Sequence, residues 1–369
     1  MRFTIQRENI LKPLQFVAGV VEKRQTLPVL SNVLVTTKDN NLSLTATDLE
    51  VEIVASTQLD VAEPGQVTIP ARKFVDICRA LPEEAQLELA FDADKDRVTI
   101  RSGKSRFTLS TLPVNDFPNI ENVSGALEFE IPQRVLKILI DKTQFSMAQQ
   151  DVRYYLNGLL LEVGDNVVKC VATDGHRLSY CEQDAVVSPS QKHQVILPRK
   201  GVMELSKILE DSESPAQVVI GSNHIRVNVE DIQFTSKLID GQFPDYDRVI
   251  PKNGDKEVLA DRQQMRQALV RTSILSNEKY RGIRLRLKPG LFQAQAHNPE
   301  MEEAEEEVEV NYQGSELEIG FNVNYLLDAL AVINSDKVKM IFADANSSCL
   351  LESDTGEDGC QYVVMPMRL

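Results

Sequence analysis

The sequence contains three copies of one pattern, and the copies keep the same internal order. TATDLE at 45–50 returns as VATDGH at 171–176 and, more faintly, as QAHNPE at 295–300. FTLSTLPVNDFP at 107–118 returns as FTSKLIDGQFP at 234–244, and its third counterpart is the chain end, YVVMPMRL. Short β-rich phrases can resemble one another by chance, but chance would not preserve both order and spacing. We therefore expect three structural modules of one kind.

Two short segments rich in turn-forming residues separate the copies. PNIENVSGAL and PKNGDKE supply the Pro, Gly and Asn residues that interrupt helices and strands. We place the modules at residues 1–125, 126–253 and 254–369. Each module then has the length of one small domain.

The modules share one alternation of strands and helices. Runs such as NLSLTATDLEVEIVAS alternate apolar and polar residues, as half-buried strands do. IPQRVLKILIDKTQF carries apolar residues at helical spacing, and Pro70 and Pro198 stand where a strand gives way to a helix. The repeated order β-α-β-β-β predicts an α+β fold, with two helices per module packed on antiparallel sheets. The six expected helices cover residues 8–24, 72–81, 132–146, 199–210, 261–275 and 324–333.

The charge of the chain is negative but unevenly distributed. A net charge of −15 argues against a nucleic-acid partner, because an acidic surface repels phosphates. The expected helices nevertheless contain more Lys and Arg than Asp and Glu, so a surface shared by these helices would be positive. For any single residue, a solvated helix face is the simpler explanation. The candidate phosphate contacts are Lys12, Arg24, Arg72, Lys73, Arg79, Arg134, Lys137, Arg199, Lys200, Arg262 and Arg266.

Two further patches carry opposite charge. DRVTIRSGKSRF at 96–107 is basic, and PEMEEAEEEVEV at 299–310 is acidic. Each is ordinarily a solvated loop and edge strand, but two chains could also pair them head to tail, and such a contact closes into a ring or grows into a filament. Charges would set the pairing and apolar area would supply most of the affinity. The candidate interface residues are Arg97, Lys104, Arg106, Phe107, Leu109, Ile274, Leu275, Glu302, Glu303, Glu305 and Glu306.

The N-terminus and the cysteines indicate a soluble intracellular protein. MRFTIQRENI lacks the apolar core of a signal peptide, and the longest uncharged run, 25–37, is too short to cross a bilayer. The five cysteines include no Cys-x-x-Cys pair. Their odd number and wide spacing predict reduced, mostly buried thiols.

No enzyme or cofactor motif is present in the sequence. Asp174 and His176 could suggest a hydrolase, but no G-x-S-x-G or other nucleophile motif accompanies them. The four histidines show no HExxH or Cys/His ligand spacing, and there is no Walker A loop or G-x-G-x-x-G. We expect no catalytic residue, no metal and no cofactor.

Several phrases together carry a resemblance to a known family. They are RYYLNG (153–158), ATDGHRL (172–178), SKLIDGQFPDY (236–246), ILSNEKYRG (274–282), NPEMEEAEEE (298–307), IGFNV (319–323) and YVVMPMRL (362–369). In this order and spacing, over essentially the whole chain, they resemble the bacterial sliding clamps, the beta subunits of DNA polymerase III.

The resemblance implies a head-to-tail homodimer, a ring of six modules with pseudo-sixfold symmetry. The helices would line the hole and encircle duplex DNA without sequence specificity, in the cytoplasm at the nucleoid. DNA contacts carried over from the family are Arg24, Gln150, Tyr154, Arg199 and Lys200, beside Arg72, Lys73 and Arg79 from the helix pattern. The expected helix 324–333 has no Lys or Arg, unlike the family's basic lining.

The resemblance also implies a peptide-binding groove between the second and third modules. Its partners would be the replicative polymerase alpha subunit, the clamp-loader delta subunit, translesion polymerases, and mismatch-repair and other proteins with a clamp-binding motif. The matching residues are Arg153, Tyr155, Leu156, Thr173, Gly175, His176, Arg177, Leu178, Pro244, Val249, Asn322, Tyr325, Ser348, Val363, Val364, Met365, Pro366, Met367 and Arg368. Asn346 departs from the aliphatic residue that relatives often carry, which predicts a more polar wall.

Two other readings remain open on the residues alone. YVVMPMRL could be a final strand with core methionines and nothing more. The repeated modules could form a protein-binding scaffold with no role on DNA. Removing the charge of several helix residues separates the scaffold from the clamp, because only the clamp needs those charges.

Overall fold

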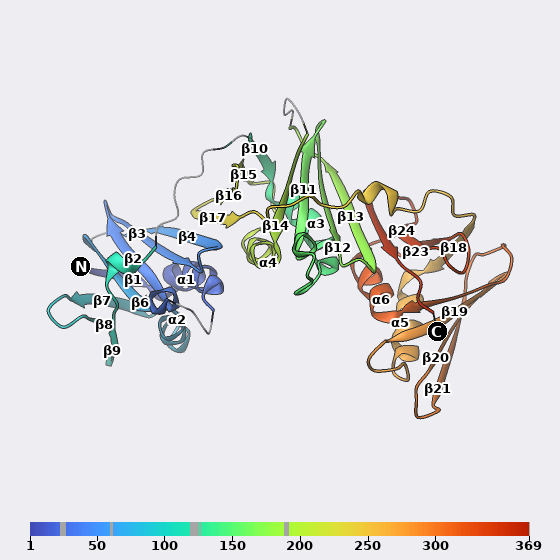
Figure 1. Cartoon of the computed structure of the whole chain (residues 1–369). Helices are drawn as coiled ribbons and strands as arrows, with labels where there is room; N and C mark the ends of the chain where they lie inside the picture. Colours follow the sequence, from blue (N-terminus) through green and yellow to red (C-terminus); the bar gives the residue numbers. More distant parts are fainter. Residues whose placement is uncertain (23–26, 60–61, 119–124, 126, 188–191, 369) are drawn as a thin grey trace. The chain divides into compact units, whose positions relative to one another are not determined.

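The computed structural model describes residues 1–22, 27–59, 62–118, 125, 127–187 and 192–368 (Figure 1). The chain forms two compact units. The first unit comprises Met1–Lys137 and Lys200–Leu238, and the second comprises Ile138–Arg199 and Ile239–Leu369. The second module of the repeat therefore contributes to both units.

The first unit contains two antiparallel sheets. One has the strand order β5-β1-β7-β8-β9, and the other has the order β10-β15-β16-β17-β4-β3-β2-β6. The strands are β1 (Arg2–Gln6), β2 (Asn32–Lys38), β3 (Asn41–Thr47), β4 (Val51–Gln58), β5 (Ala62–Glu63), β6 (Gly65–Pro70), β7 (Gln86–Asp92), β8 (Arg97–Ser102), β9 (Ser105–Ser110), β10 (Leu127–Pro132), β15 (Pro215–Ile220), β16 (His224–Val229) and β17 (Ile232–Lys237).

The second unit also contains two antiparallel sheets. Their orders are β14-β11-β12-β13-β25-β24-β23-β18 and β21-β20-β19-β22. The strands are β11 (Gly158–Gly164), β12 (Val167–Thr173), β13 (Arg177–Asp184), β14 (His193–Pro198), β18 (Lys256–Asp261), β19 (Gly282–Lys288), β20 (Leu291–His297), β21 (Glu303–Glu309), β22 (Leu317–Asn322), β23 (Lys337–Phe342), β24 (Cys349–Ser353) and β25 (Cys360–Val364).

Six α-helices lie in the described residues, two from each module. They are α1 (Arg7–Val20), α2 (Ala71–Ala80), α3 (Gln133–Asp141), α4 (Arg199–Ile208), α5 (Arg262–Ser273) and α6 (Val323–Val332). Helix α1 shows why they form: Ile10, Leu14 and Val17 recur at helical spacing and are fully buried where the helix packs on β3 and β4. No helix among the described residues is long and apolar enough to span a membrane.

The order of elements confirms the predicted α+β repeat. Strand, helix and three strands follow one another twice in each module, with only the short β5 added. The repeated Asp or Asn is explained by a turn. The Asp48 carboxylate accepts from the Glu50 and Val51 amides at 2.9 and 2.7 Å, and the Asn298 side-chain oxygen accepts from the Glu302 amide at 2.9 Å. Such side chains fix turns by bonding backbone amides a few residues on.

Four helices end within two residues of the predicted position, and two end clearly earlier. The expected helix 8–24 ends at Val20, and the expected helix 132–146 ends at Asp141, followed by a 3-10 turn at Gln144–Ser146. The second difference has a visible cause. The Thr143 hydroxyl donates to the Leu139 carbonyl at 2.5 Å, and this side-chain bond competes with continuation of the helix.

The expectation that all five cysteines are reduced was wrong for one pair. Cys181 and Cys360 form a disulfide, whereas Cys78, Cys170 and Cys349 are free and buried. A separation of 179 residues hid this pair in the sequence. The two cysteines meet because β13 and β25 are neighbours in one sheet.

Candidate functional site

The eight-stranded sheet of the second unit passes from the second module into the third where β13 pairs with β25. Figure 1 shows green β13 beside the red strands of the third module. Leu178 lies opposite Val363, and both side chains are buried. They form an apolar cluster with Leu160, Val171, Tyr180, Ile196, Phe243, Tyr246 and Leu350, against which Tyr155, Ile239, Val249, Ile250 and Ile341 pack. We call this surface the β13–β25 seam.

The chain segment 239–250 lies along the seam because several of its side chains are apolar. The Ile239 amide donates to the Ile196 carbonyl at 2.9 Å. Phe243 and Tyr246 are buried in the cluster, while Pro244 remains exposed and Val249 is half-buried. The phrase SKLIDGQFPDY thus supplies buried side chains that hold the segment on the sheet and an exposed residue next to the apolar cluster.

The turn before β13 is built by Asp174. Its carboxylate accepts from the His176 and Arg177 amides at 2.9 and 3.0 Å, as the matching aspartate does in the first module. Gly175 has φ +86, a left-handed conformation that glycine adopts without strain. The Thr173 hydroxyl closes the turn by donating to the Arg177 carbonyl at 2.6 Å. Asp174 therefore has a structural role here, and His176 is simply exposed.

Arg177 ties the two modules together. Its guanidinium pairs with Asp174 at 3.2 Å and with Asp328 of α6 at 2.5 Å, and it donates to the Phe145 carbonyl at 2.8 Å. It also lies over the Tyr325 ring, 4.6 Å from its centroid, a favourable cation–π position. Its donors are thus committed within the chain.

Arg153 is held at the edge of the same turn. Its guanidinium makes a two-bond fork with the Asp151 carboxylate at 3.0 and 2.8 Å. It lies over Gly175, where a Cβ atom would meet the guanidinium at 2.9 Å. Arg153 is exposed on its remaining side and can donate to an incoming backbone.

The ion pair with Arg153 lowers the pKa of Asp151. Hydrogen bonds from the Arg153 side chain and backbone lower the pKa of Asp151 from 3.8 to about 2. Because the folded-state pKa is depressed, the pair is fully formed above about pH 4 and is lost as the pH falls through about 2.

We expect Arg153→Ala to move the pKa of Asp151 toward 3.8. Arg248→Ala, which removes the exposed ion pair between Arg248 and Asp245, should leave the pKa of Asp151 unchanged. Carboxyl-carbon NMR titration measures this, and an Asp151 pKa near 3.8 in the parent protein would contradict it.

The chain end is fixed beyond β25 by backbone bonds. The Met365 amide donates to the His176 carbonyl, and the Met367 amide donates to the Gly320 carbonyl, both at 2.9 Å. Met365 remains 38% exposed beside the seam. Because Met365 is exposed, the reading of YVVMPMRL as a strand with core methionines alone does not fit.

The remaining peptide-site candidates in this unit have varied roles. Leu156 is a core residue, and Asn322 caps α6 by accepting from the Asn324 amide at 3.0 Å. Tyr154 and Tyr155 lie in a 3-10 turn. Their side chains point to different surroundings, since Tyr154 is 57% exposed and Tyr155 packs on the apolar cluster. Among the other candidates, Val364 is buried, Ser348 and Pro366 are partly buried, and Asn346 and Arg368 are exposed.

The equivalent seam in the first unit lacks this apolar surface. There β4 pairs with β17, and Glu52 lies opposite Thr235, both buried. In the repeat, Glu52 corresponds to Leu178 and Thr235 corresponds to Val363. The same architecture therefore presents polar groups in one unit and apolar groups in the other. Aligning the copies position by position could have revealed this from the sequence.

Some helix cations are exposed without a partner. Arg72 and Lys73 lie on the first turn of α2, and Arg266 lies on α5, each without an ion pair to another described side chain. Gln150 is exposed in a left-handed conformation near the exposed Tyr154. Arg24 falls outside the described residues.

Other helix cations are paired within the chain. Lys200 donates to the Val20 carbonyl at 2.8 Å and forms ion pairs with Glu22 and Asp48. Arg199 donates to the Met147 carbonyl at 3.1 Å, and burial lowers its pKa. Lys12 forms an ion pair with Glu210, and Arg134 forms one with Glu213. Arg262 donates to the carbonyl of Leu330 in the last turn of α6. Arg79 is exposed, and Lys137 donates to the Ser206 carbonyl.

The first unit ends in a basic edge strand. β9 is the last strand of the five-stranded sheet, so one side of its backbone has no strand partner among the described residues. Arg106 of β9, Lys104 of the turn before it and Arg97 at the start of the neighbouring β8 are exposed, and no described side chain pairs with them. Phe107 and Leu109 are half-buried between them.

The second unit ends in an acidic edge strand. β21 is the last strand of its sheet, and Glu303, Glu305, Glu307 and Glu309 all point to one exposed side. Glu306 faces the other way and pairs with Arg271 at 2.7 Å. At the end of the neighbouring α5, Ile274 is 71% exposed and Leu275 half-buried, and Glu302 accepts from the Asn298 amide side chain at 2.6 Å.

Family comparisons match every part of the chain. Residues 1–121 match the N-terminal domain of the DNA polymerase III beta subunit, 130–245 its central domain and 247–368 its C-terminal domain. The chain belongs to the DNA polymerase III beta subunit family. It is 57% identical over 370 residues to a beta sliding clamp of Pseudomonas putida and 52% identical over 371 residues to that of Escherichia coli K12. Each match covers 100% of both chains.

Solved structures of this family have the same fold. A DNA polymerase III beta subunit structure from Pseudomonas aeruginosa matches with a TM-score of 0.95 at 57% identity, covering 100% of both chains. A Caulobacter crescentus beta sliding clamp matches with a TM-score of 0.93 at 38% identity, covering 100% of this chain and 99% of the other. The resemblance seen in the sequence and the three-module clamp fold are thereby confirmed. This chain functions as a sliding clamp for DNA polymerase, a processivity factor and not an enzyme.

Proposed function

We propose that two copies of this chain join head to tail into a ring that encircles duplex DNA and tethers its partners through the β13–β25 seam. The observation that supports the ring is the pair of edge strands, a basic one in the first unit and an acidic one in the second. An edge strand with unpaired backbone groups readily accepts a further strand. Arg106 of β9, with Arg97 of β8 and Lys104 of the turn between these strands, then faces glutamates on β21 of the second copy, and Phe107, Leu109, Ile274 and Leu275 supply apolar area. The three clamp domains are residues 1–125, 126–253 and 254–369.

The seam suits short peptides with large apolar side chains. Val249 and Met365 offer a partly exposed apolar wall beside the buried Leu178 and Val363, and methionine adapts its shape to different partners. Arg153 can hold a peptide carbonyl or carboxylate. The partners we propose are the replicative polymerase alpha subunit, the clamp-loader delta subunit, translesion polymerases and mismatch-repair proteins.

The DNA contacts should be few and unspecific. Arg72 and Lys73 are the best candidates, because they are exposed and form no ion pair with another described side chain. Further candidates are Arg79, Arg266, Gln150 and Tyr154. Arg199 and Lys200 have acceptors within the chain and would need to release them. Contacts to phosphate carry no sequence information, which allows sliding. The protein would act in the cytoplasm at the nucleoid.

Charge reversal on α2 tests the DNA role. We expect an Arg72→Glu, Lys73→Glu variant to load onto nicked circular DNA roughly tenfold more slowly, because two phosphate contacts become repulsive. Neither side chain holds another part of the chain, so folding should be unaffected. A Lys38→Glu, Lys252→Glu variant with the same charge change elsewhere on the surface is the control. Equal loading of both variants would favour the scaffold reading.

A further inference from the structure

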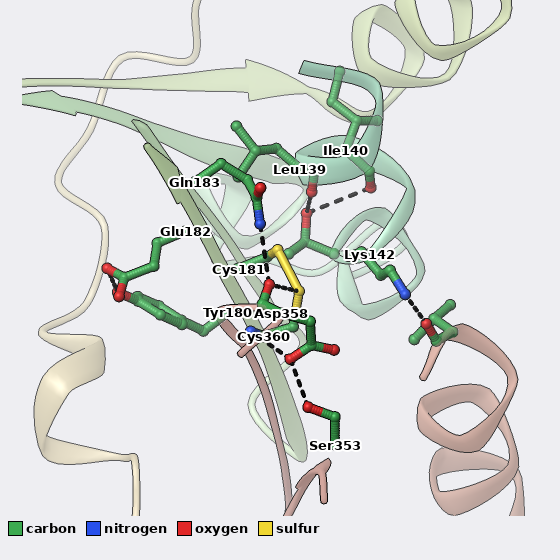
Figure 2. The surroundings of a disulfide bond; sticks show 12 residues. Leu139, Ile140, Lys142, Tyr180, Cys181, Glu182, Gln183, Ser353, Asp358 and Cys360 are labelled. Carbon is green, nitrogen blue, oxygen red and sulfur yellow. Dashed lines mark hydrogen bonds between the residues drawn. A yellow bond between two sulfur atoms is a disulfide. The ribbon is translucent and has the colours of Figure 1, made fainter. Parts of the chain in front are cut away.

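The disulfide between Cys181 and Cys360 links β13 to β25 (Figure 2). It lies on the face of the sheet opposite the apolar cluster, because successive side chains of a strand point to opposite faces and Tyr180 belongs to that cluster. The two residues are direct neighbours across β13 and β25, with Cα atoms 4.1 Å apart. The Glu182 amide donates to the Gly359 carbonyl at 2.9 Å. Cys181 and Cys360 therefore occupy a non-hydrogen-bonded pair, the position at which opposite side chains of an antiparallel sheet come closest.

A third thiol lies in the same row. Cys170 of β12 is the direct neighbour of Cys181 on its other side. The backbone groups of Cys181 point away from β25 and toward β12, which makes this a hydrogen-bonded pair of wider spacing, about 5.5 Å between Cα atoms. Sheet geometry thus selects Cys360 over Cys170 as the partner. Cys170 is fully buried and free, and burial raises the pKa of its thiol.

The surroundings hold Cys360 in place independently of the bond. Figure 2 shows Gln183, Ser353 and Asp358 around it. The Asp358 carbonyl accepts from the Gln183 amide at 3.0 Å, and its carboxylate accepts from the Ser353 hydroxyl at 3.0 Å and from the Cys360 amide at 3.3 Å. The two sulfurs are therefore brought within bonding reach by the sheet and the turn.

A small reagent can approach the pair from the end of β25. Cys360 is the first residue of that strand and follows an exposed turn that includes Gly356 and Glu357. Both cysteines are buried while the strands are paired, so a reagent reaches them when the strand end opens. Strand ends open locally more readily than strand centres, which exposes Cys360 before Cys181.

We propose that Cys181 and Cys360 form a reversible redox site that takes small disulfides and thiols and covalently staples the second module to the third. The thiolate of Cys360 attacks a small disulfide, forming a mixed disulfide and releasing one small thiol. The thiolate of Cys181 then displaces the second small thiol and closes the protein bond. Two protein thiols are oxidised and one small disulfide is reduced to two thiols, and excess thiol reverses the reaction.

The staple acts on the surface that we propose for partner peptides, and this consequence rests on that proposed function. Leu178 and Val363 lie three residues from the bonded cysteines on the same two strands. Once the disulfide has formed, β13 and β25 cannot separate. We therefore expect their pairing to persist at higher urea concentrations than in the reduced protein. A disulfide closing a long loop restricts the unfolded chain most strongly.

The full-length protein, incubated with oxidised glutathione and then alkylated under denaturing conditions, tests the site. We expect three alkylated cysteines instead of five, one proteolytic peptide pair linking Cys181 to Cys360, and return to five on treatment with reduced glutathione. Cys360→Ser should abolish the link and Cys170→Ser should preserve it. The urea midpoint should rise on oxidation in the parent and the Cys170→Ser variant only.

Two results would overturn the proposal: five alkylated cysteines in the parent after oxidation, or a link between Cys170 and Cys181. Because the decisive readout is made on the parent protein, a folding defect in one variant does not obscure it. Alkylation involves neither DNA nor peptide, so its failure is distinguishable from failure of the clamp function.

Discussion

A Val249→Asp, Met365→Asp variant should lose roughly a hundredfold or more in affinity for partner peptides, because central apolar contacts carry most of the energy of such interfaces. Both side chains are partly exposed beside the seam, so a carboxylate there is tolerated by the fold. In a complex the same carboxylate would be buried against a Leu or Phe of the peptide without a partner, which is costly. Fluorescence anisotropy with a labelled peptide carrying Leu and Phe measures the loss.

The repeat provides a matched control for this experiment. Lys237 stands at the position in the first unit that corresponds to Met365, as the last residue of β17, the strand that forms the other seam. Lys237→Asp should leave peptide affinity unchanged, and Met365→Leu should reduce it only slightly. Equal losses in the Met365 and Lys237 variants would mean that peptides do not bind at the β13–β25 seam.

Charge reversal on β8 and β9 should convert the dimer to monomers. In an Arg97→Glu, Arg106→Glu variant, glutamates would face the glutamates of β21 at both junctions, and like-charge contacts cost several kcal/mol each. We expect the dimer dissociation constant to rise roughly a hundredfold or more. Sedimentation at micromolar concentration should then give the 41.4 kDa chain mass rather than twice that value. Lys38→Glu with Lys252→Glu controls for net charge.

The complementary variant makes this prediction sharper. Glu303→Lys with Glu305→Lys should also be monomeric, since both junctions would then be basic. In a mixed head-to-tail ring, one junction pairs the new glutamates with the new lysines, and the other pairs the unchanged basic edge with the unchanged acidic edge. Mixing the two variants should therefore restore a dimer. Restoration on mixing requires these two edges to face each other. Two monomeric variants that stay monomeric when mixed would place the interface elsewhere.

The module repeat could be predicted because it depends on local chemistry. Alternation in NLSLTATDLEVEIVAS and the Asp48 turn both follow from residues close in sequence, and the structure has both. The end of α3 was placed too late because the Thr143 hydroxyl competes for a helix carbonyl, which apolar spacing does not reveal.

Contacts between residues far apart in the sequence could not be predicted for the site. Residues 181 and 360 become neighbours only through the order of strands in the sheet, so neither the disulfide nor the three-thiol row could be read from spacing. Lys200 looked like a free cation on a helix, but the fold brings Glu22 and Asp48 to it. The chain end YVVMPMRL was assigned through the family resemblance, because its own residues fit a core strand equally well.

Retention on circular DNA tests the clamp account most directly. The protein is loaded onto a nicked circular plasmid by a clamp-loading ATPase, separated from free protein in high salt, and the plasmid is then cut once. A closed ring stays on the circle in salt that screens phosphate contacts and slides off the ends after cutting. Equal retention on circular and cut DNA, or loss from both in salt, would contradict encirclement.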